Sequence, residues 1–146
     1  MKYDMEVMFY SDERNEAFAR MVISAYLARA NPMMSAISEV RTAVSEAVTN
    51  AIVHAYAGKP DGIVFMRALL KEERLEIEVE DQGCGIEDIP LAMQPFYTTQ
   101  KDNERTGMGF SLMMSFMDKV KVESTPGKGT TVIMTKQIKE EVWDVL

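Results

Sequence analysis

A strict alternation of apolar and polar residues begins at Leu75 and constrains the fold more than any other feature of the chain. Leu75, Ile77 and Val79 alternate with three glutamates, and a second apolar run at residues 63–70 precedes them across the polar loop at residues 71–74. A two-residue period is that of a β-strand with one face buried and the other in water. Two such strands joined by a short polar loop predict an antiparallel hairpin, and its apolar face must be covered by another layer.

Helix and strand signals follow one another along the rest of the chain. Ser11, followed by two acidic residues, is a typical helix N-cap, and the pair Asn31-Pro32 ends that helix. The predicted helices cover about residues 12–30, 32–56 and 107–118, and the predicted strands cover residues 7–10, 63–70, 75–81, 120–124 and 130–138. We therefore expect one domain over residues 1–146 of the α+β class: a two-layer α/β sandwich in which three helices cover one face of a mixed, mostly antiparallel sheet.

Residues 82–106 break this pattern. The segment is rich in Gly, Pro, Thr and charged residues, and it is longer than an ordinary connection between secondary-structure elements. Connections of this length inside a small domain are either functional or disordered. We interpret the segment as a mobile lid over a binding site.

Charge and composition argue against several classes of function. Sixteen Lys and Arg against 23 Asp and Glu give a net charge of -7, the wrong sign for a nucleic-acid-binding domain. The single cysteine, Cys84, has no intrachain disulfide partner, and with the single histidine, His54, it falls short of a four-ligand zinc site. The sequence has no apolar run of membrane-spanning length and no apolar signal core near its start. We expect a cytoplasmic protein whose partners include neither nucleic acid nor a membrane.

Glu46, Asn50 and His54 form a polar stripe on the second predicted helix. Their spacing of four residues places them on one side of the helix, at the border of its apolar arc. A carboxylate and an amide that project together into a cleft suit a general base and a metal ligand. The spacing alone favours a solvated helix edge with a capping histidine.

Asp81 continues the apolar series of the hairpin. By the two-residue period its side chain points to the core face, where a carboxylate needs a polar partner. Gly83 and Gly85, which follow closely, let the backbone turn and approach a ligand. The exocyclic amine of a nucleotide base would satisfy the carboxylate. A tight turn in which Asp81 accepts from its own backbone is the competing interpretation.

Two further glycine pairs follow in the chain. Gly107 and Gly109 open a predicted helix, whose free N–H groups and positive end suit a phosphate. Gly127 and Gly129 lie in a turn between two strands and are followed by Thr130. By itself the second pair is typical of an ordinary hairpin.

The order of these four signals is more specific than any one of them. Glu-x-x-x-Asn on a helix, Asp-x-Gly-x-Gly after a strand, Gly-x-Gly before a helix and Gly-x-Gly-Thr between strands resemble the ATP-binding superfamily of gyrase, Hsp90, histidine kinases and MutL, over residues 39–134. The forms Ser-Glu-Ala-Val-Thr-Asn-Ala, Glu-Asp-Gln-Gly-Cys-Gly-Ile and Arg-Thr-Gly-Met-Gly-Phe are most similar to the anti-sigma factor serine kinases of sporulating bacteria. The resemblance implies a Bergerat-type ATP-binding fold.

The resemblance also implies a role for each matching residue. Asn50 would hold Mg²⁺ beside the phosphates of ATP, and Glu46 would be the general base. Asp81 would accept a hydrogen bond from the adenine amine, and Thr130 would bind the same base through water. The other matching residues would shape the pocket or cradle the phosphates: Gly83, Gly85, Arg105, Thr106, Gly107 and Gly109. Arg105 would also face the γ-phosphate during transfer.

The family pattern implies an ATP-dependent protein serine kinase that sequesters a sigma factor and phosphorylates an anti-anti-sigma protein. It further implies a homodimer, with ATP or ADP and Mg²⁺ as cofactors. A non-enzymatic, nucleotide-gated binding module is the alternative, in which ATP only orders the lid and Glu46 is an idle surface acid. An isolated ATPase or a detached histidine-kinase catalytic domain is a third interpretation.

The first predicted helix has apolar residues on two sides. We assign its core stripe to Phe18, Met21, Val22 and Ala25. The opposite face then presents Glu16, Arg20, Ile23 and Leu27 to solvent. An apolar strip with an arginine suits a docking site for a partner, and packing against the lid or against a second copy of the chain fits it equally well.

Overall fold

The computed structural model describes residues 2–94 and 109–142. Five strands form one sheet in the order β1-β2-β3-β5-β4, and each neighbouring pair is antiparallel. The strands are β1 (Met5–Tyr10), β2 (Ile63–Lys71), β3 (Arg74–Asp81), β4 (Lys119–Thr125) and β5 (Gly129–Gln137). The α+β sandwich is therefore confirmed, although the sheet of the described residues is antiparallel throughout and not mixed.

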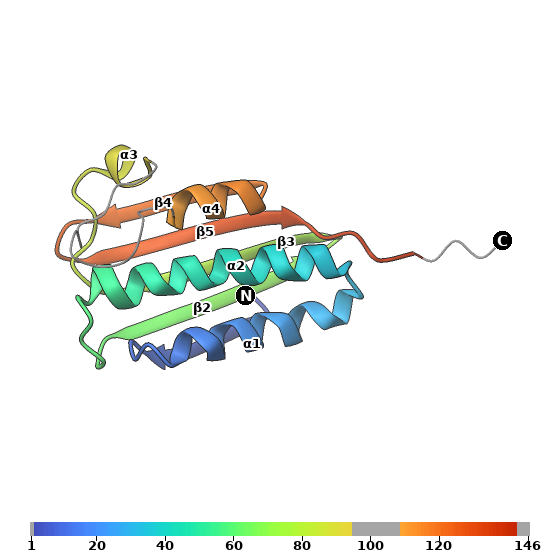
Figure 1. The fold of residues 1–146 in the computed structure, drawn as a ribbon, viewed down its shortest axis with the longest axis horizontal. Helices are drawn as coiled ribbons and strands as arrows, with labels where there is room; N and C mark the ends of the chain where they lie inside the picture. The colour runs from blue at the N-terminus through green and yellow to red at the C-terminus, as the bar shows by residue number, and fades with distance from the viewer. Residues whose placement is uncertain (1, 95–108, 143–146) are drawn as a thin grey trace.

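Three helices lie on one face of the sheet, with α2 in contact with both of its neighbours (Figure 1). They are α1 (Asn15–Leu27), α2 (Met34–Thr49) and α4 (Gly109–Phe116). A short 3₁₀ segment, η1 (Ala28–Ala30), follows α1, and the four-residue helix α3 (Ile89–Ala92) falls inside the segment predicted as a lid. The predicted cover of three helices on one face is confirmed.

The second predicted helix changes character before it ends. At Asn50, α2 passes into a π-helical segment, η2 (Asn50–Ala55). The N–H of Tyr56 donates to the carbonyl of Ala51, five residues back, at 3.1 Å. Such π-helical turns within α-helices are frequent at functional sites. This one begins at the residue expected to hold Mg²⁺.

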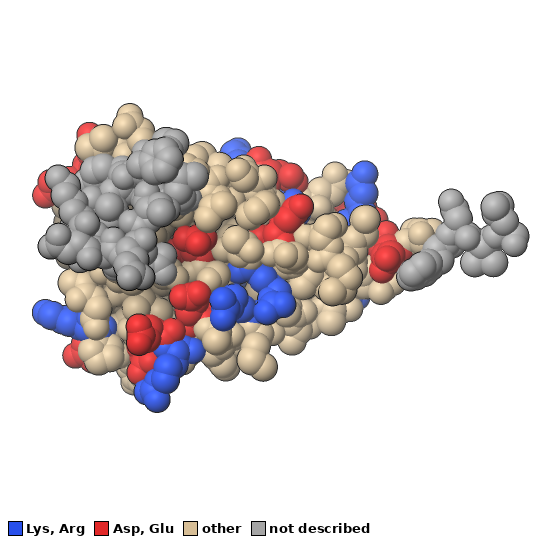
Figure 2. Space-filling model, in the orientation of Figure 1, with Lys and Arg blue, Asp and Glu red and all other residues tan. Residues whose placement is uncertain are grey.

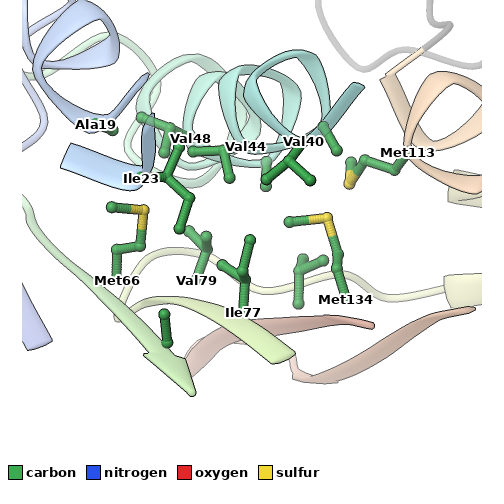
Figure 3. Close-up of a cluster of buried hydrophobic side chains, with 14 of the residues drawn as sticks. Ala19, Ile23, Val40, Val44, Val48, Met66, Ile77, Val79, Met113 and Met134 are labelled. Atoms are coloured by element: carbon green, nitrogen blue, oxygen red, sulfur yellow. The ribbon is translucent and has the colours of Figure 1, made fainter. Parts of the chain in front are cut away.

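The core lies between the helices and the sheet (Figure 3). Val40, Val44 and Val48 of α2 point toward Ile77 and Val79 of β3, and none of these side chains is more than 3% exposed. Burying a branched aliphatic side chain contributes about 1.5–3 kcal/mol. The four-residue spacing on α2 and the two-residue spacing on β3 therefore anchor the two layers to each other, as the sequence predicts.

On α1 the core face is not the predicted one. Its buried residues are Ala19, Ile23, Tyr26 and Leu27. Phe18 and Met21 are 44% and 69% exposed, Ala25 is exposed as well, and Val22 is only partly buried. Both sides of α1 carry apolar residues at helical spacing, so periodicity alone does not choose between them. Packing against α2 and the sheet selects the side that carries Ile23 and Leu27.

Candidate functional site

Asp81 is the last residue of β3 and is buried, as its place in the alternation predicts. Strand pairing places it opposite Val64 on one side and Thr130 on the other. Its Oδ1 accepts a hydrogen bond of 2.9 Å from the N–H of Gly83, so the carboxylate does bond its own loop. Burial, opposed by the backbone amides of Gly83 and Thr130, raises the pKa of Asp81 to about 6. A partly desolvated carboxylate of this kind gains from any further donor.

The glycines after Asp81 are required by close backbone approach. A Cβ on Gly83 would lie 2.4 Å from the carbonyl oxygen of Ala55, the last residue of η2. Cys84 fixes the same contact, because its N–H donates to that carbonyl at 3.0 Å. Gly85 has a φ of +73°, and a Cβ there would lie 2.3 Å from the carbonyl oxygen of Thr125. The two glycines therefore dock the loop against η2 and the β4–β5 turn, whereas the sequence pattern predicted a close approach to a ligand.

Thr130 lies on β5 directly opposite Asp81, and its hydroxyl is held by Ser124 of β4. Ser124 Oγ donates to the carbonyl of Gly129 at 2.9 Å and accepts from the N–H of Ile86 at 2.8 Å. Because Ser124 has a single hydroxyl proton, the 2.8 Å contact between the two hydroxyls requires Thr130 to be the donor. Among the described residues, no donor other than these two hydroxyls occupies the lone pairs of Thr130 Oγ1, which lie beside Asp81. Sequence reasoning missed Ser124, although its register opposite Thr130 could have been found by aligning β4 with β5.

Glu46 and Asn50 meet the first residue of α4. A Cβ on Gly109 would lie 3.3 Å from Glu46 Oε2 and 3.3 Å from Asn50 Oδ1. Gly109 therefore brings the start of α4 close to a carboxylate oxygen and an amide oxygen, where a larger residue would be crowded. Mg²⁺ prefers hard oxygen ligands and commonly takes only one or two from the protein, with phosphates and water supplying the rest. The pair fits a magnesium–phosphate group.

The structure therefore brings the predicted residues together in two groups joined by η2. One group is Glu46, Asn50 and Gly109; the other is Asp81, Gly83, Gly85 and Thr130. Asn50 begins η2, and Ala55 at its end contacts the loop of Gly83. The predicted phosphate residues Arg105, Thr106 and Gly107 lie outside the described residues, as do residues 95–106 of the predicted lid.

The predicted partner surface on α1 is wrong in its apolar part. Ile23 and Leu27 are completely buried. Glu16 is hydrogen-bonded to α2 and is not directed only at solvent. Its carboxylate accepts from Ser45 Oγ at 2.6 Å and from Thr49 Oγ1 at 2.8 Å, and these bonds connect α1 to α2. The strip of exposed aliphatic side chains expected on this side of α1 is therefore not present.

Arg20 keeps a place at the surface. Its guanidinium lies 3.5 Å from Glu16, and it borders a polar pocket of about 320 Å³ between α1 and α2. The residues that line this pocket are Arg20, Ser38, Arg41, Thr42 and Ser45. Basic side chains gather where the two helices meet (Figure 2). The pocket is polar and cationic, in contrast to the expected apolar strip.

Within residues 2–94 and 109–142, no helix is both long enough and apolar enough to cross a bilayer.

Comparison with known proteins identifies the family. Residues 9–136 match the family described as Histidine kinase-like ATPase domain. The anti-sigma F factor of Caldanaerobacter subterraneus subsp. tengcongensis is 52% identical over 140 residues, which cover 94% of this chain and 97% of that protein. The anti-sigma F factor of Halalkalibacterium halodurans is 46% identical over 138 residues, 94% of each chain. The chain therefore belongs to the histidine kinase-like ATPase domain family and, within it, to the anti-sigma F factors.

Solved structures share the fold. The RsbU and RsbW domains of Rv1364c from Mycobacterium tuberculosis align with a TM-score of 0.68 at 19% identity, over 95% of this chain and 34% of that chain, so this chain spans about a third of that protein. The catalytic domain of histidine kinase ThkA, in a nucleotide-free form, aligns with a TM-score of 0.59 at 14% identity, over 92% of this chain and 97% of that domain. At these identities the likeness establishes the fold alone.

Proposed function

We propose that the chain is an ATP-dependent protein serine kinase that also sequesters a sigma factor. One observation carries the proposal: the six-residue segment η2 connects the pair Glu46 and Asn50 to the loop that follows the buried Asp81. ATP has a base at one end and a triphosphate at the other. A site with a buried carboxylate at one end and an acid–amide pair at the other matches both ends of that molecule.

At the base end, Asp81 accepts from the adenine amine and Thr130 offers acceptor lone pairs for a bridging water. At the other end, Asn50 Oδ1 is the side-chain oxygen available to Mg²⁺, which would neutralise charge on the phosphates. Gly109 begins α4, and together with Gly107, Arg105 and Thr106 it would cradle the phosphates. ADP would occupy the same place after transfer.

Glu46 is the proposed general base. As the serine oxygen forms a bond to the γ-phosphorus, the bond from that phosphorus to the bridging oxygen breaks and ADP leaves. The hydroxyl proton passes to the Glu46 carboxylate, one helical turn from Asn50. Arg105 would stabilise the charge on the transferred phosphoryl group.

The partners follow from the relatives. Proteins named anti-sigma F factor are similar to this chain over nearly their whole length, which supports a sigma factor as the sequestered partner and an anti-anti-sigma protein as the phosphate acceptor. We place this activity in the cytoplasm, in a homodimer, and assign the cationic pocket at Arg20 to protein partners.

The test is a phosphotransfer assay with ATP labelled at the γ-phosphate and candidate anti-anti-sigma proteins. Acid-stable label recovered as phosphoserine supports the kinase. Acid-labile phosphohistidine would instead indicate a histidine-kinase catalytic domain. ATP-dependent capture of the sigma factor without any transfer would leave the nucleotide-gated binding module, and phosphate release without an acceptor would indicate an isolated ATPase.

A further inference from the structure

A tyrosine hydroxyl lies between the ends of β2 and β3, beside Asp81. Tyr56 Oη donates to the carbonyl of Ile63 at 2.6 Å and accepts from the N–H of Gln82 at 2.6 Å. The register of the hairpin pairs Val64 with Asp81, so Ile63 and Gln82 are the next residues to oppose each other. The hydroxyl therefore occupies the step at which the backbone ladder would otherwise continue.

The Tyr56 side chain is fixed in this place from several directions. Its own N–H caps η2 on the carbonyl of Ala51. Its ring lies against Gly62, where an added Cβ would come within 2.5 Å of the ring atoms. A tyrosine hydroxyl is protonated at neutral pH and can donate there, and burial raises the pKa of Tyr56 further above its usual value.

The bridging hydroxyl of Tyr56 affects the loop that follows Asp81. Because β2 and β3 cannot pair directly at Gln82, the chain leaves the sheet there and turns toward η2. Gly83 then meets Ala55, and its N–H reaches Asp81 Oδ1. The direction of the Asp81 carboxylate is thus coupled to a hydroxyl that belongs to a different element of the fold.

We propose that Tyr56 is a positioning residue for recognition of the adenine base. Its hydroxyl holds the end of the β2–β3 hairpin open, and this keeps the Asp81 carboxylate directed at the exocyclic amine. The inference rests on the proposed function, because it takes Asp81 as the acceptor of adenine.

The chain offers a matched control in Tyr26. Tyr26 Oη donates to Asp4 Oδ1 at 2.5 Å and accepts from the N–H of Leu70 at 2.8 Å. Leu70 lies at the other end of the same hairpin, where it pairs with Leu75. Tyr26→Phe therefore removes the same group, a hydroxyl that accepts from a hairpin N–H, at the end of the hairpin remote from Asp81. The donated bond differs, because Tyr26 donates to a carboxylate and Tyr56 to a backbone carbonyl.

The experiment measures ADP and IDP affinities of the wild type, Tyr56→Phe and Tyr26→Phe, because the hypoxanthine of IDP carries a carbonyl in place of the exocyclic amine. In Tyr56→Phe we expect the affinity for ADP to fall about three- to tenfold, the loss expected for one or two weakened hydrogen bonds. IDP affinity should stay unchanged, so the preference for ADP shrinks, while Tyr26→Phe keeps the wild-type preference. If Tyr56→Phe keeps the wild-type preference for ADP over IDP, or if both variants lose this preference equally, the proposal is overturned, even where a variant is less stable than the wild type.

Amide hydrogen exchange of the nucleotide-free proteins separates this inference from the proposed function. Faster exchange at Gln82 and Gly83 in Tyr56→Phe, with Tyr26→Phe as slow as the wild type, supports the role of the Tyr56 hydroxyl in positioning this loop. Unchanged exchange at these amides overturns it. A wild-type protein that binds ADP and IDP equally would contradict the role of Asp81, and the exchange result would still decide whether Tyr56 positions the loop.

Discussion

The two ends of the candidate site are built in different ways. The Asp81 end is fixed by the backbone: strand pairing sets Asp81 against Thr130, and Gly83 is in contact with Ala55. The Glu46 end consists of side chains that project from consecutive turns of one helix toward the start of α4. Changes at the first end therefore alter shape and binding together. Isosteric changes at the second end should alter chemistry while the shape stays the same.

The largest effect that sharpens this contrast is expected from Glu46→Gln. The amide keeps the size of the side chain but cannot accept the serine proton, a role worth roughly 10²- to 10⁴-fold in rate. Binding of Mg-ATP should remain within about twofold of the wild type, because the lost group acts on the acceptor and not on the nucleotide. Single-turnover phosphorylation measures the rate of transfer, and its dependence on Mg-ATP concentration measures the affinity separately.

Glu39→Gln is the matched control for Glu46→Gln. Glu39 lies on the same helix and pairs with Lys136 at 2.9 Å, so its replacement removes an equal charge from α2. We expect Glu39→Gln to phosphorylate the substrate at the wild-type rate. If Glu46→Gln phosphorylates its substrate at the wild-type rate, Glu46 is not the general base, and the nucleotide-gated binding module becomes the better account.

The next largest effect is expected from Asp81→Asn, which tests the other end. A charge-assisted hydrogen bond to adenine contributes about 1.5–3 kcal/mol, so ATP affinity should fall roughly 10- to 100-fold. GTP should compete poorly with ATP in the wild type, because guanine carries a carbonyl where adenine carries the amine. Equal affinities for ATP and GTP in the wild type would remove Asp81 from the base pocket.

A smaller effect than these two is expected from Asn50→Ala, at the same end of the site as Glu46. Its amide oxygen is the proposed metal ligand, so the gain in ADP affinity on addition of Mg²⁺ should shrink by about tenfold. Affinity measured in the presence of a chelator should change little. If Mg²⁺ strengthens ADP binding equally in the variant and the wild type, Asn50 is not the ligand.

A smaller effect concerns the stability of the nucleotide-free protein. The pKa of Asp81 is raised to about 6 in the folded state, above the value near 3.9 of an unfolded aspartate. The folded state therefore binds more protons between pH 4 and 6, and Asp81 lowers the free energy of unfolding as the pH rises through this window. Asp81→Asn lacks this cost of roughly 2.9 kcal/mol, so it should melt about 6–11 °C higher than the wild type at pH 7.5. The gain should disappear near pH 4, and a gain that persists there would contradict the cause given for the pKa shift.

The smallest effect is expected from Arg20→Ala, outside both ends of the site. It should leave ADP binding unchanged and weaken capture of the sigma factor or dimerisation about three- to tenfold, as for a single surface charge at an interface. Arg14→Ala is the control, because Arg14 is an exposed arginine of the same region that pairs with Asp12. If Arg20→Ala associates with its partners as strongly as the wild type, Arg20 is an ordinary solvated surface residue with no role in an interface.

Local periodicity predicted a large part of this molecule. The alternation at Leu75, Ile77 and Val79 identified β3, and it also placed Asp81 on the buried face of the sheet. These predictions succeeded because the period of a strand assigns every side chain to a face at once. On α1 the same reasoning failed, since Phe18 and Ile23 belong to two apolar sides that periodicity cannot rank.

The parts of the site that depend on tertiary contacts could not be predicted. The hydroxyl of Tyr56 accepts from Gln82, which is distant in sequence, and nothing in the local pattern identifies that contact. The π-helical segment η2, whose last residue contacts the Gly83 loop, likewise has no signal in the sequence pattern. The roles of Arg105 and Thr106 stay predictions.

The measurement that tests this division of roles most directly is the phosphorylation rate of Asp81→Asn and Glu46→Gln as ATP is raised to saturation. If one end binds the base and the other performs the transfer, Asp81→Asn should approach the wild-type rate at saturating ATP, with its loss confined to KM. Glu46→Gln should reach saturation at the wild-type concentration of ATP and stay slow at every concentration above it. The division of roles is contradicted if Asp81→Asn remains slow at saturation while Glu46→Gln regains the wild-type rate.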